Sequence, residues 1–110
     1  MAKYERTFSG DFDSALARLH NEIMNGSISA SLEDSSIFRM GDIRIALRVY
    51  ERYSYLGGNR LSCSVMMVGE GNTLRVTAIT SGGSQAIFFK INTFGEGAFL
   101  DKVRAAVDSL

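Results

Sequence analysis

The sequence predicts an α+β domain in which five or six antiparallel strands form a meander and two helices pack on one face of the sheet. Residues 27–92 form five strand-like stretches that are separated by glycine-rich breaks and contain no proline. A helical pattern lies on either side of this region. Short turns join antiparallel neighbours, so we expect a single domain over 1–110 with the order β-α-β-β-β-β-β-α.

The segment before the meander predicts a strand followed by a helix. Residues 3–8 alternate weakly, as a short strand would. Asp11 is suited to cap the helix, because its carboxylate can accept a hydrogen bond from the first turn. Asn25 and Gly26 are suited to end it. The apolar stripe of this helix contains Phe12, Leu16, Leu19 and Ile23.

The meander itself shows a period of two. Its clearest strand is 43–50, where aliphatic residues alternate with Arg44, Ala46, Arg48 and Tyr50. The breaks contain glycine or asparagine, as hairpin turns require. The apolar positions of the five strands are Ile28, Ala30 and Leu32; Ile43, Ile45, Leu47 and Val49; Leu61, Cys63, Val65 and Met67; Leu74, Val76 and Ala78; and Ile87, Phe89 and Ile91.

A second amphipathic helix is predicted at the C-terminus, opening at Gly95. Thr93 and Glu96 have the spacing of a capping box. The apolar stripe of this helix contains Phe99, Val103, Val107 and Leu110. An antiparallel sheet must cover one apolar face, so we expect both helices on the concave side of a curved sheet.

The order of these elements resembles a reduced helix-grip domain of the START type, in which a curved antiparallel sheet wraps a C-terminal helix. The predicted C-terminal helix is shorter than that architecture usually has, so side chains could fill the space under the sheet. The stretch 81–96, SGGSQAIFFKINTFGE, resembles a family of uncharacterised small bacterial proteins. That resemblance implies a bacterial, cytoplasmic protein and brings no activity with it.

Composition narrows the classes of partner. Twelve basic and twelve acidic residues cancel, so nucleic acid is not the expected partner. The charged N-terminal residues start no apolar region, and no apolar run approaches the roughly 20 residues that cross a membrane. We therefore expect a cytoplasmic protein without a membrane partner.

The residues that carry chemistry are few. The sequence has one histidine, one cysteine and no tryptophan, and it contains no metal, nucleotide or nucleophile motif. We therefore predict no cofactor, no metal and no catalytic residue. Cys63 lies in an apolar strand and is expected to be a buried thiol. His20 lies at the edge of the first helix's apolar stripe and is expected to be half packed and half solvated.

Arg44, Arg48 and Arg52 fall on one face of one predicted strand. We expect this to be the outer sheet face, with Arg75 among the neighbours, where the arginines could bind an anionic partner such as a phosphorylated ligand or RNA. The alternative is a solvated sheet face on which these arginines pair with Glu33, Glu51 or Glu70.

Two of the predicted strands, around 66–68 and 87–89, have apolar residues at both odd- and even-numbered positions. If Met67 and Phe89 point inward, Met66 and Phe88 lie on the outer face and mark a contact with a second copy. The alternative is a bulge that buries both sides of these strands.

Three functional hypotheses follow. The first is a non-enzymatic interaction module, a homodimer that uses its outer sheet face. The second is a carrier of a small apolar ligand between sheet and C-terminal helix, and the third is an enzyme with a dispersed site. A pocket larger than about 300 Å³ would favour the carrier. Its lining would include Phe12, Leu16, Phe89, Phe99 and Val103.

Overall fold

The computed structural model describes residues 2–25, 30–54, 59–82, 104–108 and 110, and it confirms the α+β architecture. The strand predicted over 87–91 and the start of the second helix lie outside these residues. Residues 104–108 are helical. The other elements are β1 (Ala2–Ser9), α1 (Phe12–Asn25), β2 (Ser31–Met40), β3 (Ile43–Ser54), β4 (Asn59–Glu70) and β5 (Thr73–Gly82).

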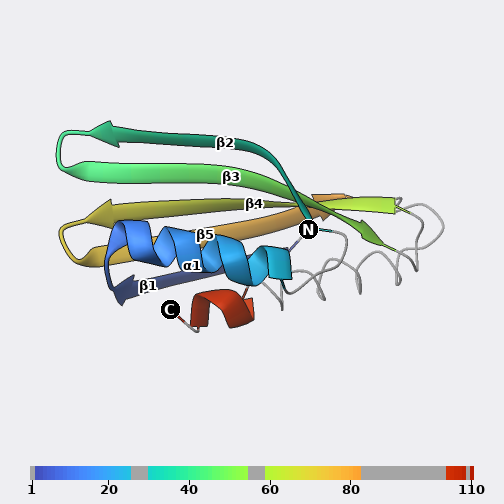
Figure 1. Ribbon diagram of the computed structural model, residues 1–110, viewed down its shortest axis with the longest axis horizontal. Coiled ribbons are helices and arrows are strands. Elements are labelled where there is room, and N and C mark those ends of the chain that lie inside the picture. Colours follow the sequence, from blue (N-terminus) through green and yellow to red (C-terminus); the bar gives the residue numbers. More distant parts are fainter. Residues whose placement is uncertain (1, 26–29, 55–58, 83–103, 109) are drawn as a thin grey trace.

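The five strands form one antiparallel sheet with the order β1-β5-β4-β3-β2. Strands β2 to β5 are the predicted meander, and β1 returns to pair with β5. The described sheet therefore has β1 at one edge and β2 at the other. The helix α1 and the helical residues 104–108 lie on the same side of the sheet (Figure 1). We call this side the inner face and the opposite side the outer face.

Two hairpins set the register of most of the sheet. In the β2–β3 hairpin Met40 pairs with Ile43, and in the β4–β5 hairpin Glu70 pairs with Thr73. Each turn begins with a glycine at positive φ, Gly41 at 60° and Gly71 at 58°. A glycine with positive φ at the first central position is what a primed hairpin turn needs. The register then decides which side chains share a face.

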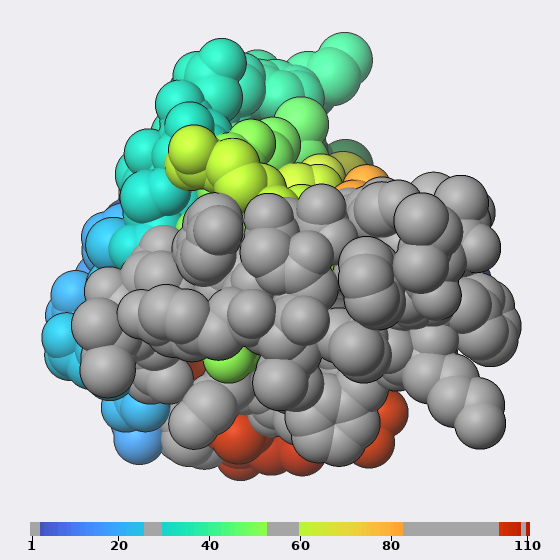
Figure 2. Space-filling view, turned by 90° about the vertical axis from the view of Figure 1, so that its right-hand side faces the viewer, coloured from blue at the N-terminus to red at the C-terminus, as the bar shows by residue number. Residues whose placement is uncertain are grey.

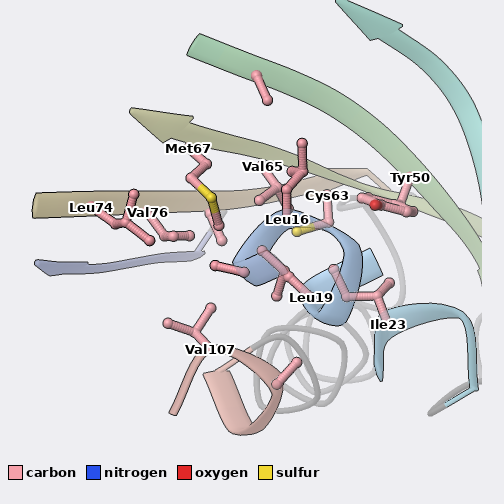
Figure 3. Packing of buried hydrophobic residues seen from close by; sticks show 14 of the residues in the cluster. Leu16, Leu19, Ile23, Tyr50, Cys63, Val65, Met67, Leu74, Val76 and Val107 are labelled. Carbon is pink, nitrogen blue, oxygen red and sulfur yellow. The ribbon is translucent and has the colours of Figure 1, made fainter. Parts of the chain in front are cut away.

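Helix α1 begins and packs as its sequence predicts. The backbone nitrogen of Ser14 donates to the Asp11 carboxylate at 2.9 Å, so Asp11 is the N-cap. The predicted stripe is buried, and it points at side chains from β4 and β3 (Figure 3). The core that results contains Phe12, Ala15, Leu16, Leu19, Ile23, Ala46, Tyr50, Leu61, Cys63, Val65, Met67, Leu74, Val76, Ala78, Ala106 and Val107.

The start of α1 lies very close to the sheet at Gly69. A Cβ atom on this residue would lie 2.8 Å from Cδ2 of Phe12 and 3.0 Å from Cδ2 of Leu74. Real Cβ atoms do not approach that closely, so the absence of a side chain at Gly69 lets the Phe12 ring lie against β4. This contact fixes one end of the helix on the sheet.

The C-terminal helical residues are held on β1 by polar and apolar contacts. Val107 is fully buried, which confirms one position of the predicted stripe. The Tyr4 hydroxyl donates to the Asp108 carboxylate at 2.6 Å, and Arg6 forms an ion pair with the same carboxylate at 3.3 Å. The Arg104 guanidinium lies over the Tyr4 ring, 4.8 Å from its centroid. The end of the chain therefore covers β1, as α1 covers β4.

Strand β3 faces the opposite way from the prediction. Ala46 pairs with the buried Met67, and Tyr50 pairs with the buried Cys63, so the even-numbered residues of β3 face the helices. The expectation that Arg44, Arg48 and Arg52 lie on the outer face is therefore wrong. The aliphatic residues Ile43, Ile45, Leu47 and Val49 take the outer face instead. Arg75 shares that outer face, opposite to the three arginines.

Candidate functional site

The outer face carries a cluster of apolar side chains that no described residue covers. The most exposed are Met40 and Phe38 on β2, with 67% and 46% of their surface accessible, and Leu47 on β3, with 41%. We call this cluster the outer apolar patch. Its members are Phe38, Met40, Ile43, Ile45, Leu47, Val49, Met66, Val68 and Ile79.

The patch is continuous because its members pair across the strands. Phe38 pairs with Ile45, and Ile45 pairs in turn with Val68. In the next row on the same face, Leu47 pairs with Met66. Side chains that are directly opposite on antiparallel strands lie about 5 Å apart and contact one another. The patch is therefore one surface across β2, β3 and β4, with Ile79 at its border on β5.

The other half of the outer face is polar. Arg75 forms an ion pair with Glu5 at 2.9 Å, and Thr77 donates a hydrogen bond to the same carboxylate. These two interactions lower the pKa of Glu5, with the Thr77 hydrogen bond contributing most. At the end of β3 that is far from the hairpin, Arg60 pairs with Glu51 at 2.8 Å. Charges therefore border the patch, and none lies among its members.

The inner face has a second feature beside α1, a row of arginines on β3 and β2. Arg44 donates two hydrogen bonds to Asp13 of α1, at 2.7 and 2.8 Å, and its guanidinium lies 4.5 Å from the centroid of the Phe12 ring. The Arg44 guanidinium lowers the pKa of Asp13. Arg39 of β2 pairs directly with Arg44 across the strands. We call Arg39, Arg44, Arg48 and Arg52 the arginine strip.

His20 and Tyr50 join α1 to β3 within this region. The Nδ1 atom of His20 lies 2.9 Å from the Tyr50 hydroxyl, and their rings are tilted against each other. Burial, with a smaller contribution from Arg48, lowers the pKa of His20. Burial raises the pKa of Tyr50, although a hydrogen bond from Arg48 opposes the effect. His20 is half-buried, as predicted, and its partners are a phenol and a guanidinium.

Cys63 is fully buried beneath α1, which confirms its prediction (Figure 3). Burial raises the pKa of its thiol to about 12. At neutral pH the side chain is therefore protonated, and a thiol without thiolate character is a poor nucleophile. Its contribution is to packing against Tyr50 and the helix. Within the described ranges, no three His, Cys, Asp or Glu side chains are grouped to hold a metal ion.

Of the residues expected to line an apolar pocket, Phe12 and Leu16 are packed in the core. The others, Phe89, Phe99 and Val103, lie outside the described residues. A hollow of about 150 Å³ lies beside the N-terminus of α1, where the end of β1, Arg18 and Leu110 surround it. That volume is below the range of about 300–1,000 Å³ that ligand pockets occupy. The carrier hypothesis therefore stays a prediction that no described cavity supports.

The structure brings Met66 to the outer face and Met67 to the core, as the parity argument expected, while Phe88 lies outside the described residues. Sequence reasoning did not single out two of the most exposed members of the patch, Phe38 and Met40, and it placed Leu47 on the inner face. The tight turns at Gly41 and Gly71 were visible in the sequence and fix two of the strand pairs. The predicted meander also places β3 beside β4, and the structure confirms that pairing.

A family model matches the whole chain, residues 1–110. The chain belongs to the Family of unknown function (DUF6054). This membership confirms the predicted resemblance to a family without an assigned activity. The resemblance to a helix-grip domain of the START type stays a prediction. No curated protein matches the chain. In the described part of the chain, no helix has the length and apolar character needed to span a membrane.

Two solved structures match the chain. The protein of unknown function PA94 from Pseudomonas aeruginosa, described as a candidate regulator, is 11% identical with a TM-score of 0.54. The match covers 89% of this chain and 81% of that one. The protein TTHA0849 from Thermus thermophilus is 12% identical with a TM-score of 0.35, over 98% of this chain and 97% of the other. At such identities the first match shows a shared fold alone, and the second carries no argument.

Proposed function

We propose that this protein is a non-enzymatic interaction module of the cytoplasm that forms a homodimer through its outer apolar patch. The observation that carries the proposal is the patch itself. It presents a continuous row of aliphatic, methionine and phenylalanine side chains across three strands, and no described residue covers it. Large contiguous apolar patches on soluble proteins mark interaction sites far more often than isolated apolar residues do.

The patch can form the centre of an interface. Its members span 43–49 on β3, 38–40 on β2 and 66–68 on β4, which at about 4.8 Å between strands and about 3.3 Å per residue is a flat area of about 200 Å². A standard interface buries about 800 Å² on each partner and has an apolar centre within a polar rim. The patch supplies the centre, and Ser36, Ser64 and the Glu51–Arg60 pair supply part of the rim.

A second copy of the chain is the partner that fits this surface best. The patch contains no charged side chain, so two patches can meet without desolvating a charge that lacks a counterion. Two sheets that stack face to face are about 10 Å apart, which lets side chains such as Leu47 and Met66 interdigitate. In an isologous contact the same patch on each subunit faces the other, so the patch needs to be complementary only to itself.

The proposal is tested by introducing a charge at the centre of the patch. We expect Leu47→Glu to convert the dimer to a monomer in analytical ultracentrifugation, because two carboxylates would be buried in one apolar contact. Thr73→Glu places the same side chain on the outer face of β5 beyond the patch, where the residue is exposed, and should leave the dimer intact. Dissociation by both variants, or by neither, would contradict the proposal.

The methionines report which face makes the contact. Met40 and Met66 lie on the outer face, whereas Met67 is buried in the core. A mild oxidant converts accessible methionine to its sulfoxide. We expect oxidation of Met40 and Met66 to slow as protein concentration rises. Oxidation of Leu47→Glu should not depend on concentration. Equal rates at all concentrations in the unmodified protein would show that this face stays free.

A further inference from the structure

Two members of the arginine strip, Arg39 and Arg48, form no ion pair with a carboxylate among the described residues. Arg39 and Arg44 are directly opposite on adjacent strands and share the inner face. Like charges in that position destabilise a sheet unless a negative group lies between or beside them. Asp13 meets this need for Arg44 through a two-point ion pair. The same carboxylate also feels the charge of Arg39.

Arg48 has a different environment from Arg44. Its Nε atom donates to the Ser35 hydroxyl at 3.3 Å, and it donates a hydrogen bond to the Tyr50 hydroxyl. Within the described residues, no carboxylate forms an ion pair with Arg48 or Arg39. The titratable groups that face Arg48 from α1 and β3 are therefore one neutral imidazole, His20, and one neutral phenol, Tyr50.

The site is open and partly preorganised. On β2 the residue between the rows of Arg39 and Arg48 is Ile37, which is 49% exposed, and its partner on β3 is the small Ala46. When the molecule is viewed from its end, the atoms of β2 lie at the top of the view, above those of α1 (Figure 2). Tyr50 is held by burial in the core and His20 by its contact with Tyr50, so the groups beside Arg48 have defined positions.

We propose that the arginine strip binds a doubly charged oxyanion, a phosphate monoester group, between Arg39 and Arg48 and beside Arg44. Guanidinium groups present planar pairs of N–H donors that match phosphate oxygens. Arg48 lies opposite Ser35, which is four residues and about 13 Å from Arg39 along β2, so both arginine side chains would extend toward each other over Ile37 to reach one phosphate. Arg44 remains paired with Asp13 and lines one side of the site.

This proposal is independent of the homodimer, because the strip and the outer apolar patch occupy opposite faces of the sheet. Loss of the dimer in Leu47→Glu should leave anion binding unchanged. Loss of the anion site should likewise leave the dimer unchanged.

The test uses His20, the single histidine of the chain, as a reporter. Inorganic phosphate is titrated into the protein at constant pH and ionic strength, and the NMR signals of the His20 ring are followed. We expect a saturable shift, with binding weakened about tenfold in Arg48→Gln because one charge-assisted interaction is lost. Arg75→Gln removes an arginine from the opposite face and should bind phosphate like the unmodified protein.

Two results would overturn the proposal. One is a His20 shift that does not saturate and that acetate or chloride reproduces at the same ionic strength. The other is unchanged phosphate affinity in both Arg48→Gln and Arg39→Gln. The second variant keeps the test decisive if Arg48→Gln folds poorly, because Arg39 is exposed on the edge strand and lies away from the core.

Discussion

Strands β2 and β5 have the same length, ten residues, and opposite environments. In β5 every second residue is buried from Leu74 to Thr80, whereas β2 has no buried residue along its length. Each strand contains four apolar residues. The difference shows that position in the sheet, and not apolar content, decides which strand contributes to the core.

The neighbours of each strand explain the contrast. Strand β5 lies between β1 and β4, and α1 and the helical residues 104–108 cover its inner face (Figure 1). Strand β2 lies at the edge and pairs only with β3 among the described strands. It nevertheless presents Ile37 on the inner face and Phe38 on the outer face. A strand with apolar residues on two exposed faces is where a partner is most expected.

A matched pair of leucines should show the contrast most strongly. Leu74 on β5 is fully buried, and Leu32 on β2 is 38% exposed. We expect Leu74→Ala to lower the free energy of unfolding by about 2–5 kcal/mol, because it leaves a cavity in the core. Leu32→Ala should cost less than about 1 kcal/mol. Urea unfolding of both variants measures the two values, and similar losses would mean that β2 is buried in solution.

The close approach of α1 to β4 gives a smaller effect. Gly69→Ala places a methyl group against Phe12 and Leu74, and the helix must move or the ring must rotate. We expect a loss of about 1–3 kcal/mol in the free energy of unfolding, as is typical of overpacking. Thermal unfolding followed by circular dichroism measures the loss. A neutral substitution would show that the covered half of the sheet is less tightly packed than described.

His20 lies at the border between the covered and uncovered parts of β3 and should give the smallest effect. Its pKa in the folded protein is lowered from 6.5 by burial and by Arg48. Well above pH 6.5 the ring is neutral in both the folded and the unfolded protein. As the pH falls below it, only the unfolded chain takes up the proton, so stability falls and then levels off below the folded pKa.

The measurement compares the unfolding free energy of the unmodified protein and of His20→Gln across this pH range. We expect the difference between the two proteins to change in the direction that weakens the unmodified protein as the pH falls. A constant difference would mean that His20 is as well solvated in the folded protein as in the unfolded chain.

Local signals predicted much of the fold. The cap at Asp11, the stripe of α1 and the turns at Gly41 and Gly71 depend on nearby residues alone, and the structure confirms them. The inward positions of β4 and β5 also follow from alternation, because both strands lie under the helices. The sixth predicted strand and most of the second helix lie outside the described residues.

Alternation failed at β3 for a physical reason. Its aliphatic residues are the more apolar set, so a rule based on hydrophobicity places them in the core. The inner face of β3 instead meets the flank of α1, where Asp13 pairs with Arg44 and His20 contacts Tyr50. Asp13 and His20 are seven residues apart on α1 and so share a helix face. That complementarity between helix and strand becomes visible only once the two elements are paired.

The most direct test of the outer apolar patch as a self-association surface is the mass of the unmodified protein in solution. Sedimentation equilibrium over a wide range of protein concentration measures this mass without a tag and without attaching the protein to a solid support. We predict the mass of two chains at high concentration and a reversible decrease toward one chain on dilution. The mass of a single chain at every concentration would contradict the account and leave the patch without the partner proposed for it.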